Sequence, residues 1–148
     1  MEPADVLRLL EALPEGRVLW LTGLGRSMVP LQWPGDGVRV LRCGEGALEA
    51  GDIALVQRRD GRLSAHLVVR TGPLETRSFL GARDEVHRVL GRVTDVRRGR
   101  LQVPLPRASR GVLLSVHRVL RGLWRQERVR RVWRGLRRRS PPLHRPGG

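Results

Sequence analysis

Short apolar runs separated by turn signals are the feature that most constrains the fold of this chain. From Arg17 to about Val103 the sequence contains the β-like runs RVLWLTGL, GVRVLR, GDIALVQ, LSAHLVVR and RVLGRVTDV, and turn signals such as PGDG, GEG and RDGR separate them. The runs are too short, and the connections too tight, for the helical crossovers of a βαβ unit. The pattern therefore predicts a mainly β body.

Helical patterns flank this body. The segment PADVLRLLEALPEG carries apolar residues at helical spacing and ends at Pro14 and Gly16, which predicts a short N-terminal helix. A second helical period runs from Gly111 to Arg139. Its first part has an apolar face composed of Leu113, Val116, Val119, Leu120, Leu123 and Trp124, with Arg118, Arg121 and Arg125 opposite.

The apolar face changes side in the second part of this helical period. Beyond Gln126 the apolar residues are Val129, Val132, Trp133 and Leu136, nearly half a turn away from the first set. We therefore expect a bend or break near Gln126–Arg128. The last residues, SPPLHRPGG, are typical of a disordered end.

The net charge of the chain differs sharply before and after residue 107. Residues 107–148 contain 13 Arg and one acid, a net charge of +12, whereas residues 1–106 contain 16 Arg and 13 acids, a net charge of +3. All 29 basic residues are Arg, so no mechanism can use a lysine amine. We expect one domain over residues 1–106 and an Arg-rich helical appendage over residues 107–148, suited to a polyanionic partner.

Several protein classes are disfavoured by what the chain lacks. No apolar run approaches the length of about 20 residues that a membrane span requires, and no export signal is recognisable. Cys43 is the only cysteine, so an internal disulfide and a Cys-based zinc site are excluded. We expect a cytoplasmic protein that can also contact a membrane peripherally. We expect no cofactor and no metal.

The segment GRSMVPLQWPGD carries the chemistry of interest. Ser27 follows a glycine-containing turn and precedes Met28, Pro30 and the Gly35-Asp36 turn, a rigid and exposed mount for a hydroxyl. A serine hydroxyl becomes a strong nucleophile only when a base removes its proton. Ser27 is therefore a candidate nucleophile that needs a base from elsewhere in the chain.

Histidine is the natural base in a chain without lysine. His66 lies in a predicted strand, after a hairpin whose turn is Asp60-Gly61. His117 and His144 lie in the basic helix and the tail, and we expect neither to be held in place. His66 is the preferred candidate, and a satisfied strand histidine is the alternative reading.

Three ordered segments resemble a known group. Ser27, Met28, Pro30, Gly35, Asp36 and Val38 match the S-M-x-P-x₄-G-D-x-V box of the signal-peptidase-like serine peptidases, which include type I signal peptidases and LexA-type repressors. AGDIALVQRRDGRLSAHLVV resembles the second box, and VLGRVTDV resembles the closing strand. The family's archaeal and sporulation-type branch places His at the base position, so the resemblance implies the Ser-His branch.

The resemblance also implies an acid that orients the histidine. In the family this Asp comes from a T-R-G-D-like stretch, but here Thr76-Arg77 is followed by Ser78-Phe79. Asp84 is the nearest replacement. The branch usually has H-R where this chain has His66-Leu67. The resemblance thus implies a serine endopeptidase that cleaves a peptide or protein substrate after small residues, with Ser27, His66 and Asp84 as catalytic residues.

Two readings of the chain stay open at this point. The first is the peptidase, with an appendage whose residues 111–139 contact an anionic membrane surface. The second is a catalytically inactive β-module that presents an Arg-rich arm to nucleic acid or an anionic membrane. Nucleic acid is the less favoured partner, because Trp124 and Trp133 lie on apolar stripes that suit a headgroup layer.

Overall fold

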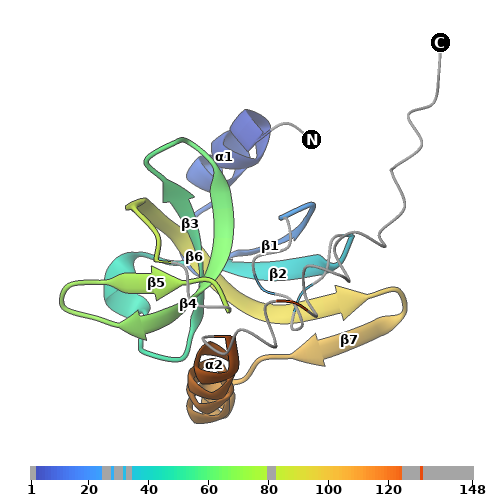
Figure 1. Cartoon of the computed structure of the whole chain (residues 1–148). Helices are drawn as coiled ribbons and strands as arrows, with labels where there is room; N and C mark the ends of the chain where they lie inside the picture. Colours follow the sequence, from blue (N-terminus) through green and yellow to red (C-terminus); the bar gives the residue numbers. More distant parts are fainter. Residues whose placement is uncertain are drawn as a thin grey trace.

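A computed structural model describes residues 3–24, 28, 32, 35–79, 83–124 and 131 of the chain. Within these residues the fold is a single antiparallel sheet of seven strands with a helix before it and a helix after it (Figure 1). Helix α1 spans Pro3–Ala12, and α2 spans Arg110–Trp124. The predicted mainly β fold, with a short N-terminal helix and a C-terminal helical segment, is confirmed. No helix in the described part of the chain is long and apolar enough to cross a membrane.

The strands follow the predicted runs closely. In chain order they are β1 (Val18–Thr22), β2 (Gly37–Arg42), β3 (Ile53–Arg58), β4 (Leu63–Arg70), β5 (Glu75–Arg77), β6 (Val86–Arg98) and β7 (Leu101–Pro104). Two short 3₁₀ helices, η1 (Glu45–Ala47) and η2 (Arg107–Ser109), lie between them. The order across the sheet is β1-β2-β6-β3-β4-β5, and β7 pairs with β6. β5 and β7 were not among the predicted runs.

The predicted hairpin joins β3 to β4. The backbone N–H of Gly61 donates to the carbonyl of Arg58 at 2.9 Å, and the Asp60 side chain accepts the N–H of Arg62 at 3.1 Å. These bonds close the Asp60-Gly61 turn and fix the register that pairs Ala54 with His66. The turn residues thus determine which face of the sheet His66 occupies.

β6 is the central strand, and it requires a glycine in its middle. It pairs with β2 and β3 on its two sides, with β-bulges in both ladders. A Cβ on Gly91 would lie 2.5 Å from the carbonyl oxygen of Leu41 and 2.7 Å from a methyl group of Val40. Gly91 in the L-G-R-V segment therefore serves the close approach of β2 and β6.

Two apolar clusters are built by alternation along the strands. Leu55 and Leu67 belong to the larger cluster, whereas their neighbours Ala54, Val56 and Val68 belong to the smaller one. Successive strand residues point to opposite faces, so the two clusters lie on opposite sides of β3 and β4. The larger cluster also contains Leu10, Leu21, Met28, Val38, Val40, Phe79 and Leu90. Cys43 is buried in the smaller cluster, where burial raises the pKa of its thiol.

Helix α2 packs on the larger cluster with only part of its predicted apolar face. Leu113, Leu114 and Leu120 contact the cluster. His117 is buried between them, and its Nδ1 donates to the Phe79 carbonyl at 3.1 Å. The expectation that His117 is not held in place is therefore wrong. It failed because the helix turns His117, and not the predicted Val116 and Val119, toward the sheet.

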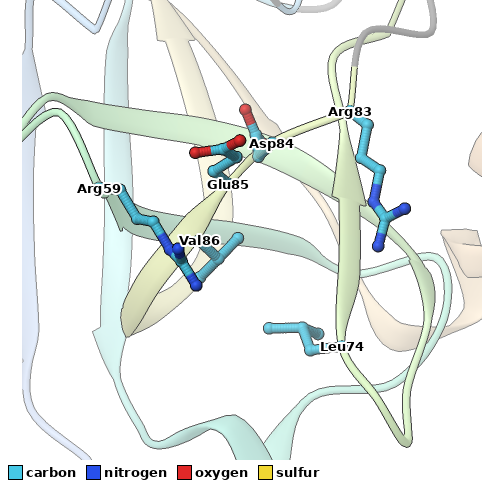
Figure 2. A pocket seen from close by; sticks show the side chains of 6 residues that line it. All are labelled: Arg59, Leu74, Arg83, Asp84, Glu85 and Val86. Carbon is cyan, nitrogen blue, oxygen red and sulfur yellow. The ribbon is translucent and has the colours of Figure 1, made fainter.

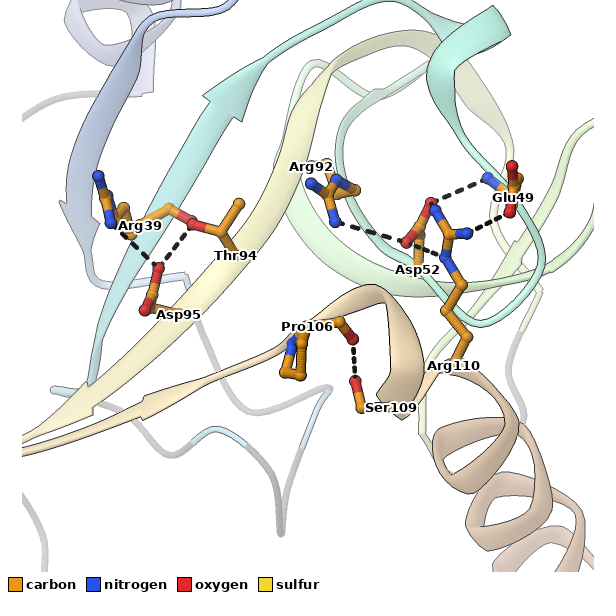
Figure 3. Close-up of polar contacts among 9 residues, drawn as sticks. All are labelled: Arg39, Glu49, Asp52, Arg92, Thr94, Asp95, Pro106, Ser109 and Arg110. Carbon is orange, nitrogen blue, oxygen red and sulfur yellow. Dashed lines mark hydrogen bonds and ion pairs between the residues drawn. The ribbon is translucent and has the colours of Figure 1, made fainter.

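An ionic contact fixes the start of α2 (Figure 3). Arg110 donates to both carboxylate oxygens of Asp52, at 2.7 and 2.9 Å, and also pairs with Glu49. Gly51 has a φ of +95°, and a Cβ there would lie 2.5 Å from the Cβ of Arg110. The Gly51-Asp52 pair thus serves both as a turn and as the docking point of α2. The predicted bend near residues 126–128 and the second apolar stripe lie outside the described residues.

Candidate active site

His66 lies in the middle of β4, on the face that carries the smaller cluster. Its neighbours Ala65 and Leu67 point into the larger cluster, so alternation sends the imidazole to the other side. Its side chain is 4% exposed. Because β4 pairs with β3 on one side and with β5 on the other, the backbone holds the imidazole in a fixed place.

Asp84 lies beside this imidazole. The residue before it, Arg83, forms a β-bridge with Arg77, and the N–H of Asp84 donates to the carbonyl of Thr76 at 3.2 Å. These backbone contacts bring the side chain of Asp84 back onto the sheet, where it is 3% exposed. His66 Nδ1 donates to Asp84 Oδ2, and the hydroxyl of Thr76 donates to the same oxygen at 2.8 Å.

The surroundings of Asp84 favour its ionised form. Burial raises the pKa of the carboxyl, but hydrogen bonds from His66 and Thr76 and the electrostatic attraction of the His66 imidazole and the Arg58 guanidinium outweigh it. The net effect is an Asp84 pKa below its ordinary value. Arg58 contributes from the opposite side, with its Nε 3.7 Å from Asp84 Oδ1. Asp84 is therefore a buried carboxylate at neutral pH.

This ionisation fixes the tautomer of a neutral His66. A carboxylate only accepts hydrogen bonds, so Nδ1 must carry the proton, and the lone pair is on Nε2. Nε2 is buried and has no hydrogen-bond partner among the residues that the structure describes. A buried, unpartnered basic nitrogen with its ring held by a carboxylate is the arrangement that general-base catalysis requires.

Ser27 lies outside the described residues. The next residue, Met28, is described and is 1% exposed in the larger cluster. Its carbonyl accepts the N–H of Gln32 at 2.9 Å. The methionine of the first box is thus a core residue, one position away from the candidate nucleophile.

The Gly-Asp pair that closes the first box has a structural role. Gly35 has a φ of +90°, a conformation that favours glycine. Asp36 is buried, and its carboxylate accepts hydrogen bonds from Arg98 of β6, the shortest of which are 3.0 Å from Nε and 2.7 Å from Nη2. The reading of this pair as a structural turn agrees with these contacts, which tie the loop after Ser27 to the central strand.

A cavity of about 530 Å³ adjoins the acid (Figure 2). Its walls are formed by Arg59, Leu74, Arg83, Asp84, Glu85 and Val86. In the close-up, the guanidinium groups of Arg59 and Arg83 extend away from the Asp84 carboxylate. Four of the six residues that line this cavity are charged.

Two further residues of the site were missed by the sequence analysis. Thr76 and Arg58 both contact the Asp84 carboxylate. Thr76 belongs to the Thr76-Arg77 stretch that matches the start of the family's T-R-G-D-like segment, and this match could have indicated a place near the acid. No sequence signal distinguishes Arg58 from the many other arginines of the chain.

Two other described histidines do not join this site. His87 is exposed on β6, and His117 of α2 is hydrogen-bonded to the Phe79 carbonyl. No family model and no curated protein matches the chain.

Proposed function

We propose that this chain is a serine endopeptidase in which Ser27 is the nucleophile, His66 the general base and Asp84 the residue that orients His66. The observation that carries the proposal is the pairing of His66 with Asp84. Both side chains are almost completely buried, and Nε2 of His66 has no hydrogen-bond partner among the described residues. Nε2 of His117 is also buried without a described partner, but the other nitrogen of that ring bonds to a backbone carbonyl and not to a carboxylate, so it is the Asp84 partner that distinguishes His66.

The proposed reaction is peptide-bond hydrolysis through an acyl-enzyme. Ser27 Oγ attacks the carbonyl carbon while its proton moves to His66 Nε2. The protonated His66 then gives this proton to the departing amine as the C–N bond breaks. Water, deprotonated by the same nitrogen, attacks the ester and releases the acid product and Ser27.

Asp84 supports this cycle at the moment when the imidazole becomes charged. Its carboxylate faces Nδ1 and stabilises the imidazolium, while the hydrogen bond from Thr76 keeps the carboxylate in place. Thr76 is therefore a positioning residue that acts through Asp84. The substrate we propose is a peptide or protein segment cleaved after small residues, in keeping with the family that the sequence resembles.

Labelling with a serine-reactive phosphonate probe tests the proposal. The full chain is incubated with the probe, digested, and the labelled peptide is mapped by mass spectrometry. We expect the label on Ser27, its loss in Ser27→Ala and strong reduction in His66→Ala. Ser115→Ala is the matched control, because Ser115 is an exposed serine of α2, and it should label as the wild type does.

Absence of labelling would favour the inactive β-module. If the folded wild type takes no label while a known serine peptidase in the same tube does, the proposed nucleophile is not activated. Labelling of another serine, with Ser27→Ala unaffected, would also contradict the assignment of Ser27.

A further inference from the structure

Helix α2 carries a second apolar surface that faces away from the sheet. It consists of Val112, Val116, Val119 and Leu123, which are 63%, 40%, 60% and 44% exposed. Their spacing of four, three and four residues places them in one line along the helix. We name this set the outer stripe.

The outer stripe is distinct from the surface that docks the helix. At 3.6 residues per turn, its centre lies roughly 130° around the helix axis from the buried His117. The sheet therefore covers one half of the apolar face that the sequence predicts and leaves the other half open. An exposed line of four aliphatic side chains is unusual for a protein surface that has no partner.

The charge around α2 indicates the chemistry of the partner. Between Asp95 and Glu127 the sequence contains eight arginines and no acidic residue. Two of them, Arg107 and Arg118, are exposed; Arg107 lies just before α2, and Arg118 lies on α2 about 130° around the helix axis from the centre of the outer stripe. Two copies of the chain that met through the outer stripes would bring two positively charged helices together, which opposes dimerisation.

Nucleic acid explains the arginines but not the stripe. Phosphate contacts are made by guanidinium and other polar groups, and valine and leucine side chains contribute nothing to them. A phospholipid surface takes both features, since acyl chains accept the aliphatic groups and anionic headgroups attract the arginines.

We propose that the outer stripe docks α2 on the surface of an anionic phospholipid membrane, with the helix lying in the interface. The inference does not depend on the proposed peptidase activity. It assigns the membrane contact to four residues of the described helix, whereas the arginines supply attraction over a longer range.

Vesicle sedimentation tests this proposal with the full chain. We expect the wild type to sediment with vesicles of mixed phosphatidylglycerol and phosphatidylcholine, and not with phosphatidylcholine alone. The variant Val119→Gln/Leu123→Gln should bind the anionic vesicles about tenfold more weakly, because it removes about half of the apolar stripe. A second variant, Val112→Gln/Val116→Gln, should give a similar loss.

The matched control changes exposed aliphatic residues elsewhere. Leu9 of α1 and Val18 of β1 are 47% and 41% exposed, and α1 lies at the far end of the molecule from α2 (Figure 1). Leu9→Gln/Val18→Gln should bind as the wild type does. Circular dichroism checks that each variant is folded, and all four changed positions of α2 are exposed, so the docked face is retained.

Three results would overturn the proposal. The first is wild-type binding in both stripe variants, which would leave the arginines as the sole determinant. The second is equal sedimentation of the wild type with neutral and anionic vesicles. The third is a dimer in sedimentation velocity that both stripe variants convert to a monomer, because the stripe would then belong to a second copy of the chain.

Discussion

His66 Nδ1 donates a hydrogen bond to Asp84 Oδ2 across 18 positions of the sequence. The donor is in β4, and the acceptor lies just before β6, on the far side of β5 in the chain. Both side chains are nearly inaccessible to solvent. Removing one member of such a buried pair is costly, because it leaves the other member buried without its partner.

Asp84→Asn tests the orienting role of the acid. Asparagine has nearly the same shape, but its neutral amide no longer stabilises the imidazolium and can hold the wrong tautomer of His66. We expect kcat/KM for peptide hydrolysis to fall by about 10³-fold, with the fold retained. His87→Ala, at an exposed histidine of β6, is the control. An Asp84→Asn enzyme as fast as the His87→Ala control would contradict the role of Asp84.

Thr76→Val tests positioning through Asp84. Valine keeps the volume of this fully buried residue but removes the hydroxyl that donates to Asp84 Oδ2. We expect the free energy of unfolding to fall by about 1 kcal/mol and the pKa of Asp84 to rise. Because the pKa of the unfolded carboxyl is the same in both proteins, the loss of stability on acidification should begin at the same pH but be smaller, and be complete at a higher pH, in Thr76→Val.

The measurement for Thr76 is a series of urea unfolding curves at acidic pH. The lowered Asp84 pKa contributes stability that is complete above the unfolded pKa and is lost as pH falls through the folded pKa. Thr76→Ser, which retains the hydroxyl, should lose stability over the same pH range as the wild type. If Thr76→Val and Thr76→Ser lose stability over the same pH range, the hydroxyl does not act on Asp84.

Arg110→Met tests the ionic contact that docks α2. The substitution leaves the buried carboxylate of Asp52 without its two short hydrogen bonds, although the backbone N–H of Glu49 still donates to it at 2.9 Å. We expect the free energy of unfolding to fall by about 3 kcal/mol. Arg118→Met, at an exposed position of the same helix, should change it by less than about 0.5 kcal/mol.

A double-mutant cycle separates the pair from other effects of the Arg110 change. In an Asp52→Asn background the charge is already absent, so Arg110→Met should cost much less than in the wild type. Equal costs in the two backgrounds would mean that Arg110 stabilises α2 by other contacts.

His117 makes the docking of α2 sensitive to acid. Burial lowers its pKa below the ordinary value, the hydrogen bond to Phe79 opposes this, and nearby arginines add to the lowering. The arginines are Arg121, Arg77 and Arg118. The unfolded chain thus binds the proton more readily than the folded one, so this part of the stability is complete above about pH 6.5 and falls below it.

The comparison of wild type with His117→Gln measures this contribution. Glutamine can still donate to the Phe79 carbonyl but does not titrate. Between about pH 6.5 and pH 5, the wild type should lose up to about 1.4 kcal/mol per pH unit more than the variant. Parallel pH profiles would contradict a neutral, buried His117.

The strands could be predicted because their information is local. Alternation in LSAHLVVR and the Asp60-Gly61 turn set β4 and its register, and the structure reproduces both. The same pattern placed His66 in a strand of fixed geometry. β5 and β7 were missed because runs of three and four residues are too short to show a period.

Contacts between distant segments could not be predicted in the same way. In the sequence, Asp84 was chosen as the partner of His66 only because the resemblance implies an acid and Asp84 is the nearest one. No local pattern shows that the chain after β5 brings Asp84 back to His66. The prediction of which face of α2 packs on the sheet was wrong for a related reason. Periodicity shows which residues of a helix share a side, but contacts with the sheet decide that Leu113, His117 and Leu120 are the side that is covered.

The most direct test of the account is cleavage of a complex peptide mixture. The full-length wild type, Ser27→Ala and His66→Ala are incubated with the mixture at neutral pH, and new peptide ends are identified by mass spectrometry. The account predicts new ends after small residues with the wild type and their absence with both variants. Cleavage that persists in Ser27→Ala, or a folded wild type that cleaves nothing in the mixture, would contradict it.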